Sequence, residues 1–240
     1  MKETTMSNEY MRTVSRSGAG AVDQGLRSYM LGIYNYMALG LSLTGLVATL
    51  VASSPALLQA IYGSPLQFVV MLAPVGFVFF LSFRLHAIQA STAQMLFWAY
   101  SGLMGLSLSW IFLAYTGASV AKVFFVTAGT FGAMSLYGYT TQKDLTGLGS
   151  FLLMGLIGLI LASLVNIFVK SSAFEFVISA IGVLIFTGLT AYDTQVIKSE
   201  YIEGDDREIM MKKSIMGALR LYLDFINLFL HLLRFLGDRR

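Results

Sequence analysis

Four ionisable residues lie within or at the edge of long apolar stretches, where a charge is costly. They are Arg84, Asp193, Arg220 and Asp224. A charge at the centre of a hydrocarbon layer costs ~2.5–3.5 kcal/mol or more, so each residue needs a partner, a water-filled cavity or a function. Two carboxylates that lie close together in a low dielectric cannot both ionise readily, so they share a proton. Asp193 and Asp224 are therefore candidates for a proton-operated switch, with Arg84 as the arginine that holds the pair together.

The stretches around these residues exclude a water-soluble fold. Of the 240 residues, 56% are apolar and only 12% are charged, against ~25% charged in globular domains. Residues 28–83 and 85–121 contain no Asp, Glu, Lys or Arg. A helix on a soluble protein needs a polar face, whereas a spanning helix needs ~20 apolar residues. The sequence therefore predicts a polytopic membrane protein.

The apolar runs divide into seven expected spans. Strands of a membrane barrel would show alternation over ~10 residues, which is absent here, so the spans are helices. They cover about 28–52, 65–83, 92–115, 118–139, 148–169, 174–196 and 214–236. Residues 53–65 contain two turn signals, Ser53-Ser54-Pro55 and Gly63-Ser64-Pro65, on either side of a short amphipathic patch. We expect an all-α seven-helix bundle over residues 27–237, preceded by a polar cytoplasmic tail over residues 1–26.

Composition removes several further classes of function. The chain has no cysteine and two histidines, which excludes a disulfide scaffold, a thiolate metal site and a cysteine nucleophile. The net charge of +3 is dispersed, so no nucleic-acid partner is expected. No cofactor is expected either.

The distribution of Lys and Arg predicts a cytoplasmic N-terminus. Ten of these residues fall on the side of the tail if the seven spans alternate, and five fall on the opposite side, which the positive-inside rule assigns to the cytoplasm. The five include Arg234, Arg239 and Arg240, so the basic C-terminus is discordant. A seventh segment that enters the membrane and returns would remove the discord.

The same directions place the candidate residues in one half of the membrane. Asp193 lies within about one turn of the cytoplasmic end of the sixth span, and Arg84 closes the second span on that side. Asp224 lies ten residues into the seventh span, a depth of ~15 Å at ~1.5 Å per residue. Two plainer interpretations stay open: Asp193 as an interfacial residue, and Asp224 as the i, i+4 ion-pair partner of Arg220.

Three other features yield narrower expectations. The acidic run over residues 200–208 is typical of a solvated loop, and His231 of a packed histidine. If the seventh helix closes a pore, its apolar flank is the expected plug; that flank consists of Leu221, Phe225, Leu228 and Phe229.

Three segments carry a resemblance to a known family. They read GLTAYDTQVIK at 188–198, LRLYLDFINLFLHLLRFLG at 219–237 and YGYTTQKDLTGLGSFLLMGLIGLI at 137–160. In type and order they resemble the Bax inhibitor-1 (transmembrane BAX-inhibitor motif) family, and the match covers about residues 27–237.

The resemblance implies a seven-helix bundle with a central last helix and a pH-sensitive calcium leak channel. The two-aspartate sensor of the family falls on Asp193 and Asp224, which would also be the residues that meet calcium as the transported ion. Its partner arginine falls on Arg84. The short tail and loops, without a eukaryotic targeting signal, resemble those of a bacterial member in the cell inner (plasma) membrane, with calcium, protons and the lipid bilayer as partners.

Two other functions compete with a leak channel. A non-transporting scaffold, or a regulator that binds a membrane protease or another membrane-protein partner, would use the same bundle. An intramembrane aspartyl protease would also carry a YD motif like Tyr192-Asp193. However, the second motif of such proteases is GxGD, and here Leu221, Tyr222 and Leu223 precede Asp224. We therefore expect the protein not to be an enzyme.

Overall fold

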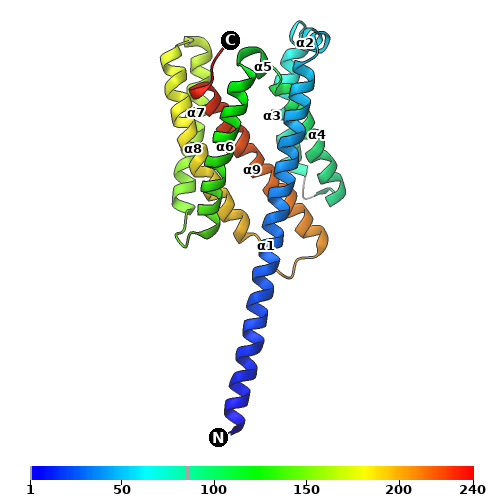
Figure 1. The fold of residues 1–240 in the computed structure, drawn as a ribbon, viewed down its shortest axis with the longest axis vertical. Helices are drawn as coiled ribbons and strands as arrows, with labels where there is room; N and C mark the ends of the chain where they lie inside the picture. Colours follow the sequence, from blue (N-terminus) through cyan, green and yellow to red (C-terminus); the bar gives the residue numbers. More distant parts are fainter. Residues whose placement is uncertain (1, 85–86) are drawn as a thin grey trace.

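The computed structural model is a bundle of long helices (Figure 1). It describes the backbone of residues 2–84 and 87–240, and the side chains of residues 24–81, 83–84 and 87–240. The helices of the described residues are α1 (Lys2–Ala52), α2 (Pro55–Tyr62), α3 (Leu66–Arg84), α4 (Ala90–Leu108), α5 (Ile111–Ala114), α6 (Gly117–Thr140), α7 (Thr146–Val169), α8 (Ser172–Ser199) and α9 (Arg207–Leu236). The predicted all-α class is confirmed. The predicted tail over residues 1–26 falls on α1, and its side chains up to residue 23 lie outside the described residues.

Six helical segments are long and apolar enough to cross a membrane on their own. They are Gln24–Ala52 of α1, Ala90–Ala114 of α4 and α5, and the helices α6, α7, α8 and α9. The seventh candidate is the pair α2 and α3, which bends by 81°. Gly63, Ser64 and Pro65 separate these two helices, so the turn signal read from the sequence marks the bend. The chain is a multi-pass membrane protein.

Side-chain caps fix where several helices begin. Ser54, Thr116, Ser171 and Asp206 each precede a helix in extended conformation and accept a hydrogen bond from the backbone N–H three residues later. Such a cap satisfies one of the four N–H groups that a helix leaves unpaired at its start. The caps therefore fix the first residues of α2, α6, α8 and α9 through local hydrogen bonds.

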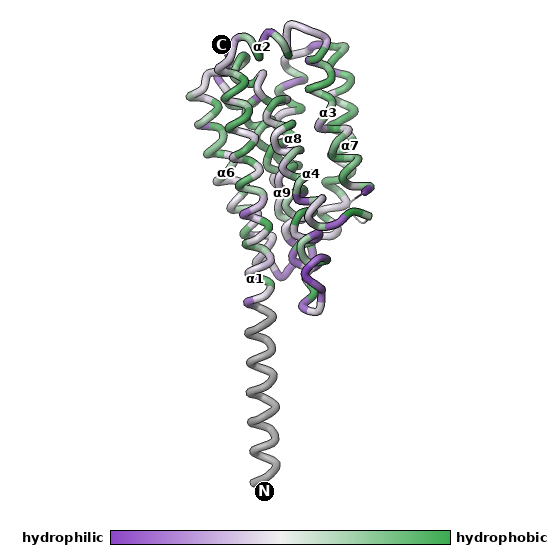
Figure 2. Tube along the Cα trace, turned by 90° about the vertical axis from the view of Figure 1, so that its right-hand side faces the viewer, coloured by the Kyte–Doolittle hydropathy of each residue, from purple (hydrophilic) through white to green (hydrophobic). Residues whose placement is uncertain are grey.

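The last helix, α9, occupies the centre of the bundle. Of its most apolar stretch, 72% is buried, against 11% for α7, which lies at the periphery. Helices α8, α1, α6 and α4 all pack against α9, and Figure 1 shows it crossing behind α1 and α6. Hydrophobic residues cover the height of the bundle, whereas hydrophilic residues gather at its two ends (Figure 2). The central position expected for the last helix is confirmed.

Helix α9 is continuous over 30 residues, so it does not enter and return as the discordant C-terminal charges allowed. The C-terminus lies at the end of the bundle opposite the α8–α9 loop (Figure 1). There Arg239 pairs with Glu175 at 2.7 Å, and its backbone forms a bridge with Tyr115. A local ion pair therefore offsets part of the positive charge that made the C-terminus discordant.

Small residues allow two close helix contacts. A Cβ added to Gly105 of α4 would lie 2.7 Å from the carbonyl oxygen of Thr44, and one added to Gly138 of α6 would meet the backbone of Ala191. By contrast, a Cβ at Gly132 or Gly158 would meet nothing within 4 Å. The close contacts between α1 and α4 and between α6 and α8 therefore require glycine at positions 105 and 138. Glycine is not required for packing at positions 132 and 158.

Candidate functional site

Asp224 lies in the middle of α9 and is buried, with 5% of its surface exposed. Its Oδ2 atom has no N–H or O–H donor among the described residues. A buried carboxylate without donors is costly, because it loses its hydration and gains nothing in return. The environment of Asp224 is therefore incomplete unless another titratable group meets it.

Asp193 of α8 is that group. Helices α8 and α9 pack side by side, and the carboxyl groups of Asp193 and Asp224 lie within hydrogen-bonding reach of each other. Asp193 is only partly buried. An ionised carboxylate can only accept a hydrogen bond, so a bond between two carboxyl groups requires a proton on one of them. Asp193 and Asp224 can therefore form a hydrogen bond with each other only when the pair holds a proton.

The arginine whose charge acts on this pair is Arg220. It lies one turn before Asp224 on α9, and it acts electrostatically on both aspartates. Its Nη1 atom forms an ion pair with Glu200 at 3.3 Å. The i, i+4 ion pair between Arg220 and Asp224 that the sequence allowed is therefore replaced by a pair between α9 and the end of α8.

Arg84 lies elsewhere. It ends α3, its side chain is exposed, and it forms no ion pair among the described residues. The principal contacts of α3 are with α4 and α2, so it stands at the edge of the bundle. We expected Arg84 to meet the two aspartates, but the structure places it away from them. Arg220 was visible in the sequence as an intramembrane charge, but its link to Glu200 was not.

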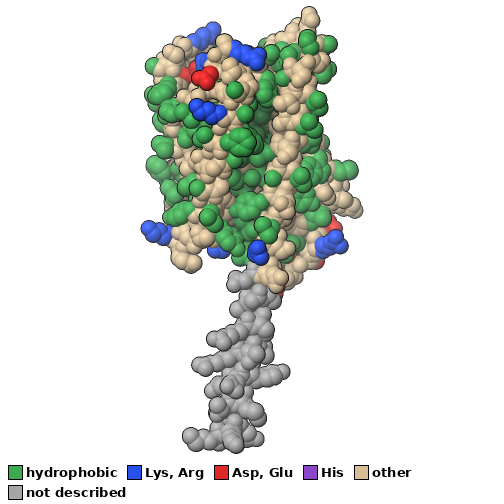
Figure 3. All heavy atoms as spheres, in the orientation of Figure 1, with side chains coloured by type: hydrophobic (Ala, Val, Ile, Leu, Met, Phe, Trp, Pro, Cys, Tyr) green, Lys and Arg blue, Asp and Glu red, His purple; other side chains and the backbone are tan. Residues whose placement is uncertain are grey.

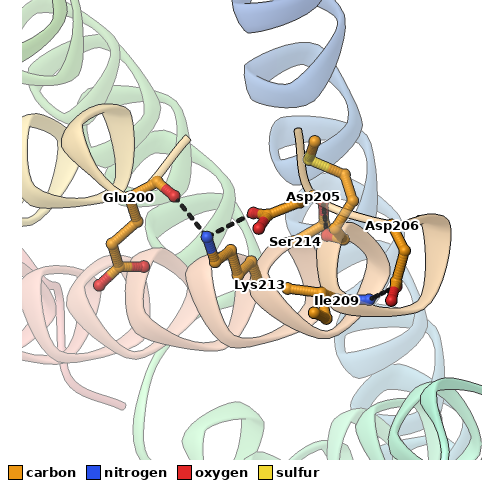
Figure 4. Close-up of polar contacts among 7 residues, drawn as sticks. Glu200, Asp205, Asp206, Ile209, Lys213 and Ser214 are labelled. Atoms are coloured by element: carbon orange, nitrogen blue, oxygen red, sulfur yellow. Dashed lines mark hydrogen bonds and ion pairs between the residues drawn. The ribbon is translucent and has the colours of Figure 1, made fainter. Parts of the chain in front are cut away.

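The acidic α8–α9 loop is structured by ion pairs at the mouth of the site. Lys213 donates from Nζ to the carbonyl oxygen of Glu200 at 2.8 Å and to the carboxylate of Asp205. Asp206 accepts a hydrogen bond from the backbone N–H of Ile209 at the start of α9, as Figure 4 shows. Ile202, Glu203, Gly204 and Asp206 are exposed, as expected for a solvated loop, and ion pairs to α9 tie the loop down as well. Its contacts join the end of α8 to Lys213 and Arg220 of α9 in one framework.

Aromatic rings fill the bundle beyond the carboxyl pair. Phe225, one residue after Asp224, packs against Phe124 at 5.4 Å and Phe131 at 5.5 Å between ring centroids. Phe229 lies 6.4 Å from Phe124. Leu221, Phe225, Leu228 and Phe229, the flank expected to act as a plug, are all buried. Together with α6, this flank forms an apolar layer between the carboxyl pair and the far end of the bundle.

Another titratable residue in this region is His231, two residues beyond Phe229. It is buried at 8% exposure and stacks on Phe186 at 5.6 Å, and Gly182 leaves the space that its ring occupies. The packed histidine expected from the sequence is confirmed. The described residues contain no group of three His, Cys, Asp or Glu side chains that could hold a metal ion, so any calcium site here would consist of two carboxylates plus carbonyl oxygens or water.

Known proteins match this chain over the whole length of the bundle. A family model described as inhibitor of apoptosis-promoting Bax1 matches residues 26–240. The inner membrane protein YbhL of Escherichia coli is 50% identical over 90% of this chain and 94% of its own length. An uncharacterized protein of Rickettsia prowazekii, RP147, is 50% identical over 97% of this chain and 99% of its own length. The resemblance that the three sequence segments carried is confirmed.

Proposed function

The chain belongs to the family of inhibitors of apoptosis-promoting Bax1, and from this premise we propose that it is a pH-sensitive calcium leak channel gated by Asp193 and Asp224. The observation that carries the proposal is the meeting of two carboxyl groups on neighbouring helices, one of them buried without another donor. A pair that needs one proton responds to pH by its nature.

The gate follows from the electrostatics of the pair. With one proton, the two carboxyl groups attract each other and hold α8 against α9, which is the closed form. When that proton leaves, two negative charges repel each other in a low dielectric, and Arg220 offsets only one of them. Repulsion shifts α9, and with it the apolar layer around Phe225. A local change of charge thereby moves a packed helix between two positions.

Calcium is the ion that suits this chemistry. It takes six to eight oxygen ligands and tolerates irregular coordination by carboxylates, carbonyls and water. Asp193 and Asp224 present the carboxylate oxygens that this ion prefers. Two carboxylates form an incomplete site, which suits an ion in transit better than a stored one.

We place the protein in the bacterial inner membrane with its N-terminus in the cytoplasm. The relative YbhL is named an inner membrane protein, and ten Lys and Arg residues fall on the tail side against five on the other. This orientation puts the α8–α9 loop, Arg220 and the carboxyl pair on the cytoplasmic side. The pair then senses cytoplasmic pH.

A non-transporting scaffold is the second candidate, because the same carboxyl pair could stabilise the bundle without passing ions. Proteolysis is disfavoured, since Leu221 and Tyr222, which stand before Asp224, are completely buried among other helices and leave a substrate backbone no room to approach. We therefore propose a protein that is not an enzyme.

Calcium flux into vesicles tests the proposal. The purified chain is reconstituted with an enclosed calcium dye, and the initial rate is measured from mildly acidic to mildly alkaline pH. We expect the rate to rise with pH in the wild-type protein. Asp193→Asn and Asp224→Asn each remove one charge of the pair, so each should flatten this dependence. A wild-type rate equal to that of protein-free vesicles at every pH would favour the scaffold, and unchanged pH dependence in both variants would remove the sensor.

A further inference from the structure

A laterally open groove of about 460 Å³ lies between α1 and α6. Its volume is within the roughly 300–1,000 Å³ of small-molecule sites. Apolar side chains form most of its wall, among them Met30, Leu31, Met37, Phe131 and Leu136. Tyr34 and Ser135 join the two helices inside the groove, with their hydroxyl oxygens 2.6 Å apart. On the face shown in Figure 3, hydrophobic side chains line the valley between α6 and α1.

The groove has the length of one leaflet. On α1 it runs from Arg27 to Met37, ten residues or ~15 Å at ~1.5 Å per residue. On the antiparallel α6 it runs from Tyr139 to Phe131. A hydrocarbon core is ~30 Å thick, so one leaflet is about half of that. An object that fills the groove therefore reaches from the interface to the middle of the membrane, as an acyl chain does.

The interfacial end of the groove is basic. Arg27 lies there with an exposed side chain. Lys198 stands over the ring of Tyr139 and donates to its carbonyl oxygen at 2.8 Å. Three acidic residues in and next to the nearby α8–α9 loop are already paired, Glu200 with Arg220, Asp205 with Lys213 and Glu208 with Lys212. The charge at this end is complementary to a phosphate.

We propose that this groove is a binding site for an anionic phospholipid of the leaflet on the α1 N-terminal side. One acyl chain lies along the apolar wall between α1 and α6, and the phosphate meets Arg27. A basic pocket between spanning helices is a recognised way to hold an anionic headgroup. The site is separate from the carboxyl pair and does not depend on the proposed leak.

Two variants, each with a matched control, test the apolar wall of the groove and its basic end separately. Gly132 lines the groove, and a Cβ there meets nothing within 4 Å, so Gly132→Leu fills the groove without displacing a helix. Gly129 lies one turn away on α6, is exposed and is equally unobstructed, which makes Gly129→Leu the matched control. Arg27→Gln removes the charge, and Lys143→Gln, at the same end of the bundle, is its control.

Native mass spectrometry of the full chain in detergent, with phosphatidylglycerol or phosphatidylcholine added, gives the retained lipid directly. We expect the wild-type protein to retain phosphatidylglycerol in preference to phosphatidylcholine. Arg27→Gln should reduce this preference by about fivefold, the effect of one basic residue near an anionic headgroup, and Gly132→Leu should abolish retention of both lipids. Equal retention by Gly132→Leu and Gly129→Leu, or an unchanged preference in Arg27→Gln, would overturn the site.

A second measurement does not depend on filling the groove. The chain has no cysteine, so Gly132→Cys and Gly129→Cys each accept a single fluorophore in nanodiscs. Phosphatidylglycerol with a nitroxide on its acyl chain should quench the label at position 132 more strongly than nitroxide-labelled phosphatidylcholine does. At position 129 the two lipids should quench equally. The same ratio at both positions would mean that bulk lipid alone fills the groove.

Discussion

Replacing Arg220 by glutamine is the sharpest test of the proposed gate, because we propose for Arg220 the role that the sequence suggested for Arg84. Arg220 and Asp224 are one turn apart on α9, a spacing of ~6 Å between side chains. At an effective dielectric of ~20, a charge at that distance contributes ~3 kcal/mol. The Arg220 side chain is 39% exposed and already paired with Glu200, so we reduce this by about half for solvent screening.

The remaining ~1.4 kcal/mol corresponds to about one pH unit. Without Arg220, the negative charge of the carboxyl pair is offset less, so the pair keeps its shared proton to higher pH. Since loss of that proton opens the gate, the pH midpoint of calcium flux should rise by about one unit in Arg220→Gln. Arg220→Lys retains the charge and should shift the midpoint less.

Dye-loaded vesicles measure the midpoint, and Arg84→Gln is the matched control. Arg84 is an arginine that closes a predicted span, but it is exposed at the edge of the bundle, so its removal should leave the midpoint unchanged. A downward shift in Arg220→Gln would reverse the proposed sign. An equal shift in both variants would show that Arg84, and not Arg220 alone, controls the pair.

Two further predictions concern packing. In Gly138→Ala the new Cβ would collide with the backbone carbonyl of Ala191, which cannot move aside as a side chain can. We therefore expect a loss of ~1–3 kcal/mol in folding stability and a lower melting temperature in detergent than for Gly129→Ala. Equal melting temperatures would refute the close contact between α6 and α8. Phe225→Ala removes the ring that fills the centre of the apolar layer, so calcium flux at acidic pH, where we expect the wild-type protein to be closed, should rise. Phe235→Ala, at the exposed end of α9, is the control and should not raise the flux. An unchanged rate in Phe225→Ala would place the barrier elsewhere.

The membrane class and the order of the spans could be predicted from the sequence because hydrophobicity is a local property. Residues 28–83 carry no charge, and no tertiary arrangement in water could bury them. The turn signals at residues 53–65 also mark the bend between α2 and α3, since proline and capping serine act on the backbone next to them. The depths of Asp193 and Asp224 followed from counting residues along regular helices.

Only the tertiary structure decided which charges meet. Two arginines and two aspartates at similar depth can pair in several ways, and the choice depends on how each helix is rotated and which helices are neighbours. Helix α3 packs at the edge of the bundle and takes Arg84 with it, whereas α9 brings Arg220 between the carboxyl pair and Glu200. Neither rotation nor neighbourhood is encoded in the period of one helix.

The same distinction holds for the small residues and the groove. Gly105, Gly132 and Gly138 look alike in the sequence as glycines in apolar helices. The structure puts backbone against Gly105 and Gly138 and open space against Gly132. Spacing along a helix determines which residues share a face, but the distance to the next helix is set by all the contacts of the bundle together. That distance makes one glycine a packing contact and another the wall of a groove.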